Sequence, residues 1–217
     1  MPLEGTAEEA RGVAGVLKGA QVFTGAQALE SVVKRLKGPS ILHVATHGFF
    51  RQRQADEAAA RKEGARDGAE VSTALTARNA LLRSGLALAG ANSLDDGHGD
   101  DGILTAMEAA GLDLHGTKLV VLSACETGVG EVQNGEGVYG LRRALVLAGA
   151  ESQVMALWKV DDDATRGLMI DFYKRLQSGA GRAEALRQVQ LRMIKDGEHE
   201  QPYFWAGFIL IGDWRPL

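Results

Sequence analysis

Residues 119–128 read LVVLSACETG, an apolar run that ends at Cys125, the only cysteine among the 217 residues of the chain. A second apolar run, ILHVA at residues 41–45, is followed by THG at residues 46–48. Short apolar runs bounded by small or polar residues are typical of buried strands in a parallel sheet. Because ligands and chemistry collect at the carboxyl ends of such strands, the pattern predicts an imidazole and a thiol side by side.

The bulk composition is that of an ordinary globular domain. Hydrophobic residues make up 45% of the chain and charged residues 24%, and the formal net charge is −4. A chain of this length builds one substantial core and is too short for two comfortable domains, so we expect a single domain over residues 1–217. The weak negative charge creates no strong field, so neither nucleic acid nor a membrane surface is expected as a partner.

The sequence carries no signal of export. Its longest apolar runs fall far short of the ~20 residues needed to cross a bilayer. The first residues, MPLEG, lack the basic and apolar regions of a signal peptide, and a single cysteine forms no internal disulfide. We therefore expect a cytoplasmic protein.

Short apolar runs alternate with helical patterns, which predicts an α/β fold with a mostly parallel central sheet flanked by helices. Strands are expected at residues 21–23, 40–46, 85–90, 118–124, 153–160 and 208–211. Helices are expected at residues 7–17, 26–36, 138–148, 164–177 and 182–195. A shorter helix is opened by the capping-box spacing of Thr105 and Glu108. Asp162 or Asp163 is expected to cap helix 164–177.

Three polar or glycine-rich segments are expected to be loops. Residues 49–80 have no sustained apolar face, which predicts a flexible surface insertion. The cluster DDGHGDD at residues 95–101 lacks the ligand order of an EF-hand, so a solvated turn with Asx capping is expected there rather than a metal site. The glycine-rich residues 128–137 lack a phosphate-loop motif and suit a mobile loop beside the active site.

Five motifs taken together resemble the CHAT domain family. They are HVATHG at residues 43–48, VLSACETG at 121–128, NGEGVYGL at 134–141, LWKVDD at 157–162 and YFWAGF at 203–208. The resemblance extends from about Leu3 to Gly212. CHAT domains are caspase-like peptidase domains, often attached to tetratricopeptide repeats in bacterial proteins and usually found at the C-terminal end of a longer protein.

The resemblance implies a caspase-hemoglobinase-like sandwich with a catalytic dyad of His47 and Cys125. The separation of the two residues exceeds the ~50 residues typical of caspases, and the insertion at 49–80 would account for the difference. We expect the N–H groups of Gly48 and Cys125 to form the oxyanion hole, since a glycine lets its backbone approach a ligand closely. No metal or organic cofactor is required.

Each candidate residue has a structural alternative. A lone cysteine is most often a buried small hydrophobe, and a histidine at a strand end often hydrogen-bonds only the backbone. His43 lies an even four residues before His47, and we expect it to fill the core or to support His47. Glu126 is expected to raise the pKa of the neighbouring thiol, so that His47 takes its proton as substrate arrives.

Substrate recognition is assigned to the strand after the nucleophile, where the substrate backbone would pair in caspase-like folds. Trp158 is a candidate wall of the pocket, and a core aromatic is the equal alternative. Asp161 is the candidate partner of an Arg or Lys side chain at P1, the substrate residue before the scissile bond, and capping of helix 164–177 is its alternative.

The leading hypothesis is a regulated cysteine endopeptidase that cleaves a protein or peptide substrate through a thioester acyl-enzyme. The resemblance implies a role in bacterial defence or cell death, with a tetratricopeptide-repeat module or other activator and a gasdermin-like effector as candidate partners. The alternatives are a catalytically silent domain that binds a partner peptide and a non-peptidase thiol hydrolase or acyltransferase.

Overall fold

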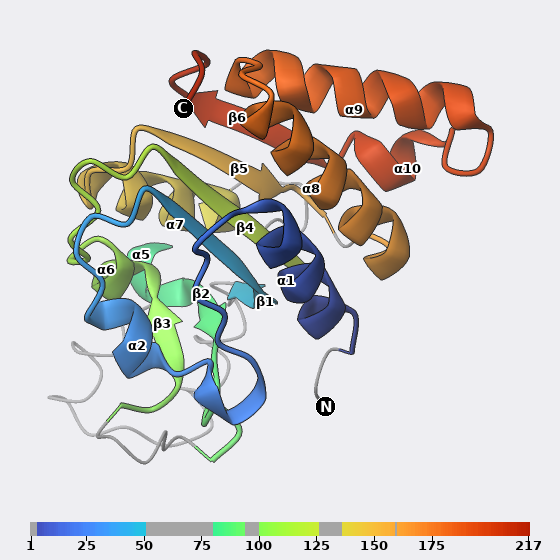
Figure 1. Cartoon of the computed structure of the whole chain (residues 1–217). Coiled ribbons are helices and arrows are strands. Elements are labelled where there is room, and N and C mark those ends of the chain that lie inside the picture. Colours follow the sequence, from blue (N-terminus) through green and yellow to red (C-terminus); the bar gives the residue numbers. More distant parts are fainter. Residues whose placement is uncertain (1–3, 51–79, 94–99, 126–135, 159) are drawn as a thin grey trace, which may run out of the picture.

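The computed structural model describes residues 4–50, 80–93, 100–125, 136–158 and 160–217 (Figure 1). Within these residues, a six-stranded sheet lies between two layers of helices. Residues 51–79 of the predicted insertion and most of the glycine-rich loop fall outside the described residues, whereas residues 49 and 50 belong to β1 and residue 80 to α5. Their mobility stays a prediction.

The sheet is mixed rather than mostly parallel. Its strands are β1 Ile41–Phe50, β2 Ser84–Ala87, β3 Ile103–Thr105, β4 Leu119–Cys125, β5 Ser152–Ala156 and β6 Phe208–Gly212. They lie in the order β3-β2-β1-β4-β5-β6. Strands β1, β4 and β5 are parallel, whereas β2, β3 and β6 join by antiparallel pairs. The predicted α/β sandwich is thus confirmed, and the parallel arrangement holds for its three central strands.

Helices cover both faces of the sheet. The helices are α1 Glu4–Val16, α2 Glu30–Lys34, α5 Ala80–Arg83, α6 Ala106–Ala109, α7 Glu136–Leu147, α8 Asp162–Gln177, α9 Arg182–Asp196 and α10 Pro202–Trp205. Helices α1, α8 and α9 lie on one face, and α2, α5, α6 and α7 lie on the other (Figure 1). No helix in these ranges is both long enough and apolar enough to span a membrane.

Alternation along the central strands builds the two cores. In β4, Leu119 and Val121 pack under α1 and α8, whereas Val120 and Leu122 pack under α6 and α7. Successive side chains of a strand point to opposite faces, so an entirely apolar strand fits only between two covered faces. This explains why the apolar runs before His47 and Cys125 form central strands.

Several element boundaries differ from the predicted ones. Residues 21–23 form no strand, and Val22 and Phe23 are 41% and 45% exposed, which an interior strand would not allow. The predicted helix at 26–36 is shortened to a 3₁₀ turn, Gly25–Gln27, followed by α2. Strand β5 ends at Ala156 rather than residue 160, and just beyond it the N–H of Leu157 still donates to the carbonyl oxygen of Gly207 at 2.8 Å.

Local capping signals set the helix ends. Thr105 and Glu108 form the predicted capping box at the start of α6. At α8 the predicted caps are wrong: the cap is Asp161, whose Oδ1 accepts from the N–H of Ala164 at 2.9 Å, because the helix begins at Asp162. Asp162 and Asp163 lie instead in the first turn, where their charges favour the helix dipole.

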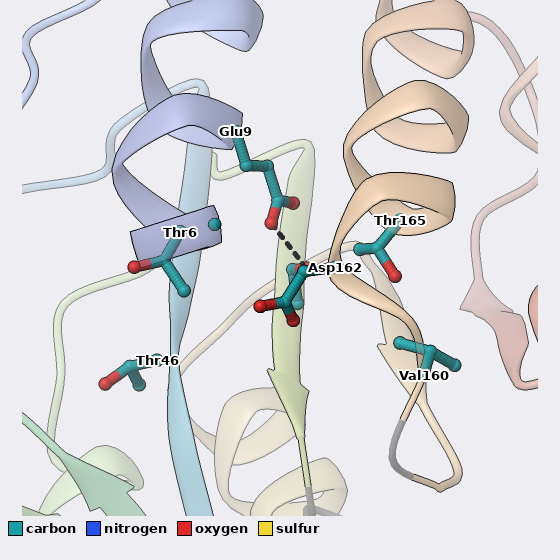
Figure 2. A pocket seen from close by; sticks show the side chains of 8 residues that line it. Thr6, Glu9, Thr46, Val160, Asp162 and Thr165 are labelled. Carbon is teal, nitrogen blue, oxygen red and sulfur yellow. Dashed lines mark hydrogen bonds between the residues drawn. The ribbon is translucent and has the colours of Figure 1, made fainter. Parts of the chain in front are cut away.

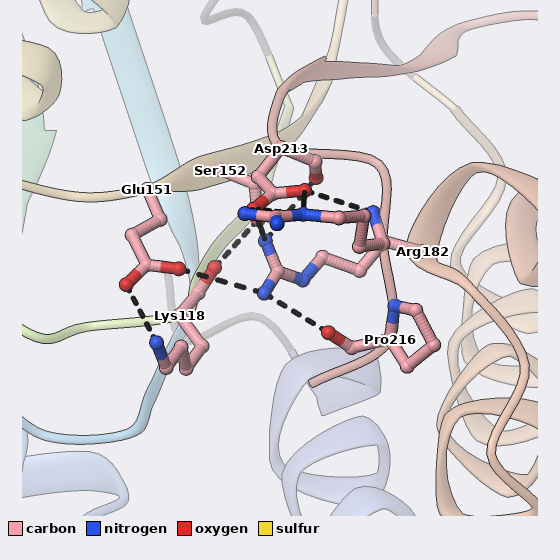
Figure 3. Close-up of polar contacts among 7 residues, drawn as sticks. Lys118, Glu151, Ser152, Arg182, Asp213 and Pro216 are labelled. Atoms are coloured by element: carbon pink, nitrogen blue, oxygen red, sulfur yellow. Dashed lines mark hydrogen bonds and ion pairs between the residues drawn. The ribbon is translucent and has the colours of Figure 1, made fainter.

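The C-terminal segment is held by a buried arginine at the start of α9 (Figure 3). The guanidinium of Arg182 is 2% exposed and donates to Ser152 Oγ at 3.3 Å and to the carbonyl oxygens of Asp213 at 3.2 Å and Pro216 at 3.4 Å. It also lies 3.6 Å from a carboxylate oxygen of Glu151. One side chain therefore ties α9, β5 and the last residues together.

Candidate active site

The positions of His47 and Cys125 meet where β4 ends beside β1, which does not stop at residue 46 as expected but runs on to Phe50. Strands β1 and β4 are parallel and in register from the pair Ile41 and Leu119 to the pair His47 and Cys125. The side chain of His47 lies at the surface. The sequence placed both residues at strand ends, and the tertiary structure makes the two strands neighbours and the two residues register partners.

Strand β1 continues past His47 and is held there from its other side. Antiparallel β2 pairs with β1 from His47 to Phe50, with Gly48 opposite Leu86. The hydroxyl of Thr46 donates a hydrogen bond to the carbonyl oxygen of Ala87 in β2. Gly48, the predicted oxyanion donor, is buried within this paired segment. Two neighbouring strands thus fix the backbone around His47.

His43 is anchored in the core, one of the two roles expected for it. Its Nδ1 lies 3.0 Å from the hydroxyl of Tyr173 on α8, and its Nε2 lies 3.1 Å from a carboxylate oxygen of Glu9 on α1. Burial and the charge of Glu9 raise the pKa of Tyr173 well above its usual value. Tyr173 therefore keeps its proton and shares one hydrogen bond with Nδ1, whereas the carboxylate of Glu9 can only accept, so the hydrogen bond between them is donated by Nε2 of His43.

Glu9 is the residue of this region that the sequence reasoning missed. It is 4% exposed, and its second carboxylate oxygen accepts the hydroxyl proton of Ser123 on β4 at 3.0 Å. The signal was present: Glu9 and the core residue Val13 lie four residues apart, on one face of α1. A glutamate on the apolar face of a helix indicates a buried polar partner.

A small pocket opens beside the two strand ends, between the first turns of α1 and α8 (Figure 2). It is lined by Gly5, Thr6, Glu9, Thr46, Ser123, Val160, Asp162 and Thr165. Thr46 directly precedes His47, and Ser123 lies two residues before Cys125. The carboxylates of buried Glu9 and exposed Asp162 make the lining acidic.

The hydroxyl of Thr165 gives this pocket a buried polar group without a partner. Thr165 is 4% exposed, and its Oγ1 has no hydrogen-bond partner within the described residues. Buried hydroxyl groups are normally hydrogen-bonded, so an open one in a pocket wall is available to a ligand.

The two residues predicted to bind substrate have structural contacts of their own. The indole N–H of Trp158 donates to the carbonyl oxygen of Tyr203 at 3.1 Å, and its ring packs against the core beside Gly207. The carboxylate of Asp161 caps α8. These contacts agree with the structural alternatives, and a role of either residue in substrate binding stays a prediction.

The acidic loop is described only at its end. Asp101 accepts from the N–H of Ile103 at 2.9 Å, the Asx capping that was predicted. Asp100 pairs with Lys34 at 2.8 Å, and Lys34 also contacts Glu30 and Glu108 at 2.7 and 3.0 Å. Burial raises the pKa of Glu30. Lys34 is thus the counter-charge of three carboxylates, and in the described ranges no cluster of His, Cys, Asp or Glu is spaced to hold a metal ion.

The fold and the meeting of a histidine and a cysteine position at strand ends are those of a caspase-like α/β domain. The chain belongs to the CHAT domain family, whose family model matches residues 1–213. It is also similar to the mouse (Mus musculus) and human (Homo sapiens) tetratricopeptide repeat protein 28, at 34% identity over 110 residues. That match covers 51% of this chain and only 4% of each relative.

Proposed function

We propose that the chain is a cysteine endopeptidase in which His47 and Cys125 form the catalytic dyad. The observation that carries this proposal is the register of β1 and β4, which makes the two residues partners at the point where these parallel strands stop pairing, at the carboxyl end of β4. The exposure of His47 supports it further, because a general base must reach substrate and solvent.

The mechanism follows from these positions. The thiolate of Cys125 attacks the scissile carbonyl carbon, and His47 accepts the thiol proton. The N–H groups of Gly48 and Cys125 stabilise the negative oxygen of the tetrahedral intermediate. His47 then protonates the leaving amine, and water hydrolyses the thioester to return the free enzyme. Every proton and bond change is accounted for by the dyad, the peptide and water.

The pocket itself admits little more than a water molecule, so we propose that the P1 side chain lies at its acidic rim beside the dyad rather than inside it. Asp162 is exposed in its lining, whereas the carboxylate of Asp161 caps α8 and that of Glu9 accepts two hydrogen bonds. We therefore assign the pairing with a P1 Arg or Lys to Asp162 rather than Asp161. A hydroxyl at Thr165 offers a further acceptor to a cationic group.

The test of the proposed function is cleavage of a fluorogenic peptide library varied at P1, with the wild-type protein and the Cys125→Ala variant in parallel. We expect cleavage that is preferential after Arg or Lys and absent from Cys125→Ala, since the variant has no nucleophile. Equal cleavage by both proteins would refute the dyad. If no peptide is cleaved but a partner protein co-purifies with the chain, the result favours a catalytically silent domain that binds a partner.

The Asp162→Asn substitution is expected to lower kcat/KM for peptides with Arg or Lys at P1 by about tenfold to a hundredfold, the value of one charged hydrogen bond. Peptides with norleucine at P1 should change less than about threefold, because they make no such bond. Asp161→Asn is the matched control: it removes the neighbouring charge, and asparagine still caps the helix. A larger loss in the control would return the P1 role to Asp161.

The biological setting proposed is bacterial defence or cell death, with a tetratricopeptide-repeat module as regulator and a gasdermin-like protein as a candidate substrate. The similarity to tetratricopeptide repeat proteins supports the regulatory module. A cytoplasmic location accords with a nucleophile that needs a reduced thiol.

A further inference from the structure

Three buried polar side chains and the partly buried His43 form a network beneath the proposed dyad. Glu9 accepts from Ser123 on β4 at 3.0 Å and lies 3.1 Å from Nε2 of His43 on β1. His43 in turn lies 3.0 Å from the hydroxyl of Tyr173 on α8. One carboxylate on α1 thus links the two strands that end in the dyad positions, and Figure 2 shows Glu9 reaching from α1 toward β4.

The network lies close to the dyad along both strands. His43 precedes His47 by four residues, and Ser123 precedes Cys125 by two. In the parallel register, Ser123 is the partner of Ala45 rather than of His43. Glu9 therefore bridges two positions, His43 and Ser123, that are offset along the strands by the two residues from His43 to Ala45. At about 3.3 Å per residue, the bridge lies roughly 7–13 Å from the dyad positions along the strands. A shift of one strand against the other would change the separation of His47 and Cys125 directly.

Helix α1 rests on the sheet through very few buried residues. Among its described residues only Glu9 and Val13 are buried, and they lie four residues apart on the same helical face. Val13 joins the apolar core under α8. Helix α1 packs mainly against α8, and Glu9 makes its polar contacts to β1 and β4, so one carboxylate connects α1 with both strands.

The burial of Glu9 means that its carboxylate must be hydrogen-bonded within the protein. A carboxylate removed from water is stable only when hydrogen-bond donors replace the lost hydration. The hydroxyl of Ser123 and the Nε2 proton of His43 supply those donors, and Tyr173 fixes the orientation of the imidazole. If one partner is lost, the others must rearrange or admit water, because interior polar groups are rarely left unpaired.

We propose that Glu9 is a positioning residue of the active site, which acts through His43 and Ser123 to set the relative placement of the β1 and β4 ends. This inference rests on the proposed function. Helix α1 would then regulate the active site, because movement of α1 away from the sheet would remove the Glu9 contacts to β1 and β4 at the same time.

The test is a double-mutant cycle read out by alkylation of Cys125 with iodoacetamide at pH 7. Because Cys125 is the only cysteine, the alkylation rate reports one thiol. His47→Ala is measured in the wild-type background, in Glu9→Gln and in Glu8→Gln. Glu8 is the matched control, since it is the preceding residue of α1, is exposed and pairs with Arg166.

We expect His47→Ala to slow alkylation by about tenfold or more in the wild-type and Glu8→Gln backgrounds, because His47 draws the proton from the thiol. In Glu9→Gln the same change should slow it by less than about threefold, the mark of energetic coupling between the two sites. Because alkylation through the unfolded state does not depend on His47 and would also reduce the ratio, the free energy of unfolding of each variant is measured alongside, and rates are compared under conditions where every variant is folded.

An equal effect of His47→Ala in all three backgrounds would overturn the inference and leave the dyad intact. No effect of His47→Ala in the wild-type background would overturn the dyad itself, and the inference with it. If Glu9→Gln does not fold, Ser123→Ala takes its place, since it removes the contact of Glu9 with β4; an unreduced ratio in that variant would equally overturn the inference.

Discussion

The His47→Ala variant is expected to lose about 10²–10⁴-fold in kcat/KM for a cleaved peptide while it keeps its fold. Its side chain is exposed at the end of β1, so truncation leaves no cavity in the core. The loss reflects the missing general base for Cys125 and the missing acid for the leaving amine. Steady-state kinetics and the midpoint of urea unfolding, measured on the same preparation, check both parts.

His43→Gln is the comparison within the same strand. His43 is partly buried between the buried side chains of Tyr173 and Glu9, so its replacement disturbs two hydrogen bonds to interior groups. We expect it to lower the free energy of unfolding by about 1–3 kcal/mol, the usual effect of an unsatisfied buried polar group. If His47→Ala keeps full activity, or if the two variants lose stability equally, the assignment of a catalytic role to His47 and a structural role to His43 is wrong.

The Arg182→Met substitution is expected to lower the free energy of unfolding by about 3 kcal/mol, because it removes a buried cation from anions and carbonyl groups arranged around it. The carbonyl oxygens of Asp213 and Pro216 would lose their donor, and the side chain of Glu151 would lose one of its cations. Urea unfolding measures the loss, and limited proteolysis near the C-terminus should be faster in the variant.

Arg187→Met is the matched control, because it makes the same exchange on the same helix. Arg187 is 60% exposed and pairs with Glu184 at 2.7 Å. Exposed ion pairs contribute little, so we expect a change within about 0.5 kcal/mol. Equal effects of the two substitutions would show that Arg182 is not the anchor of the C-terminal segment.

The carboxylates around Arg182 also indicate how this anchor responds to acid. A hydrogen bond from Lys118 lowers the pKa of Glu151, and hydrogen bonds from Arg215 lower that of Asp213. A carboxyl whose pKa is lowered by folding adds stability that is complete above its unfolded pKa and is lost as the pH falls through the folded value. The anchor should therefore persist at neutral pH and weaken only in acid.

The sequence by itself determined the local features of this protein. The apolar runs before His47 and Cys125 predicted two buried strands, and the spacing of Thr105 and Glu108 predicted a capped helix. Both signals act over a few residues, through side-chain periodicity and hydrogen bonds within one turn. They can therefore be recognised without knowing which other segments pack against these residues. The motifs also predicted the family, which the match over residues 1–213 confirms.

Only the tertiary structure decided which segments meet. The antiparallel pairing of β2, β3 and β6 depends on how the chain returns to the sheet, which no local pattern encodes. The contacts of Glu9 with His43 and Ser123 join residues 34 and 114 positions apart. Arg182 likewise reads as a surface residue until β5 and the C-terminal segment enclose it. Burial arises when distant segments pack together, and so the polar groups that hold this site became visible only in the folded chain.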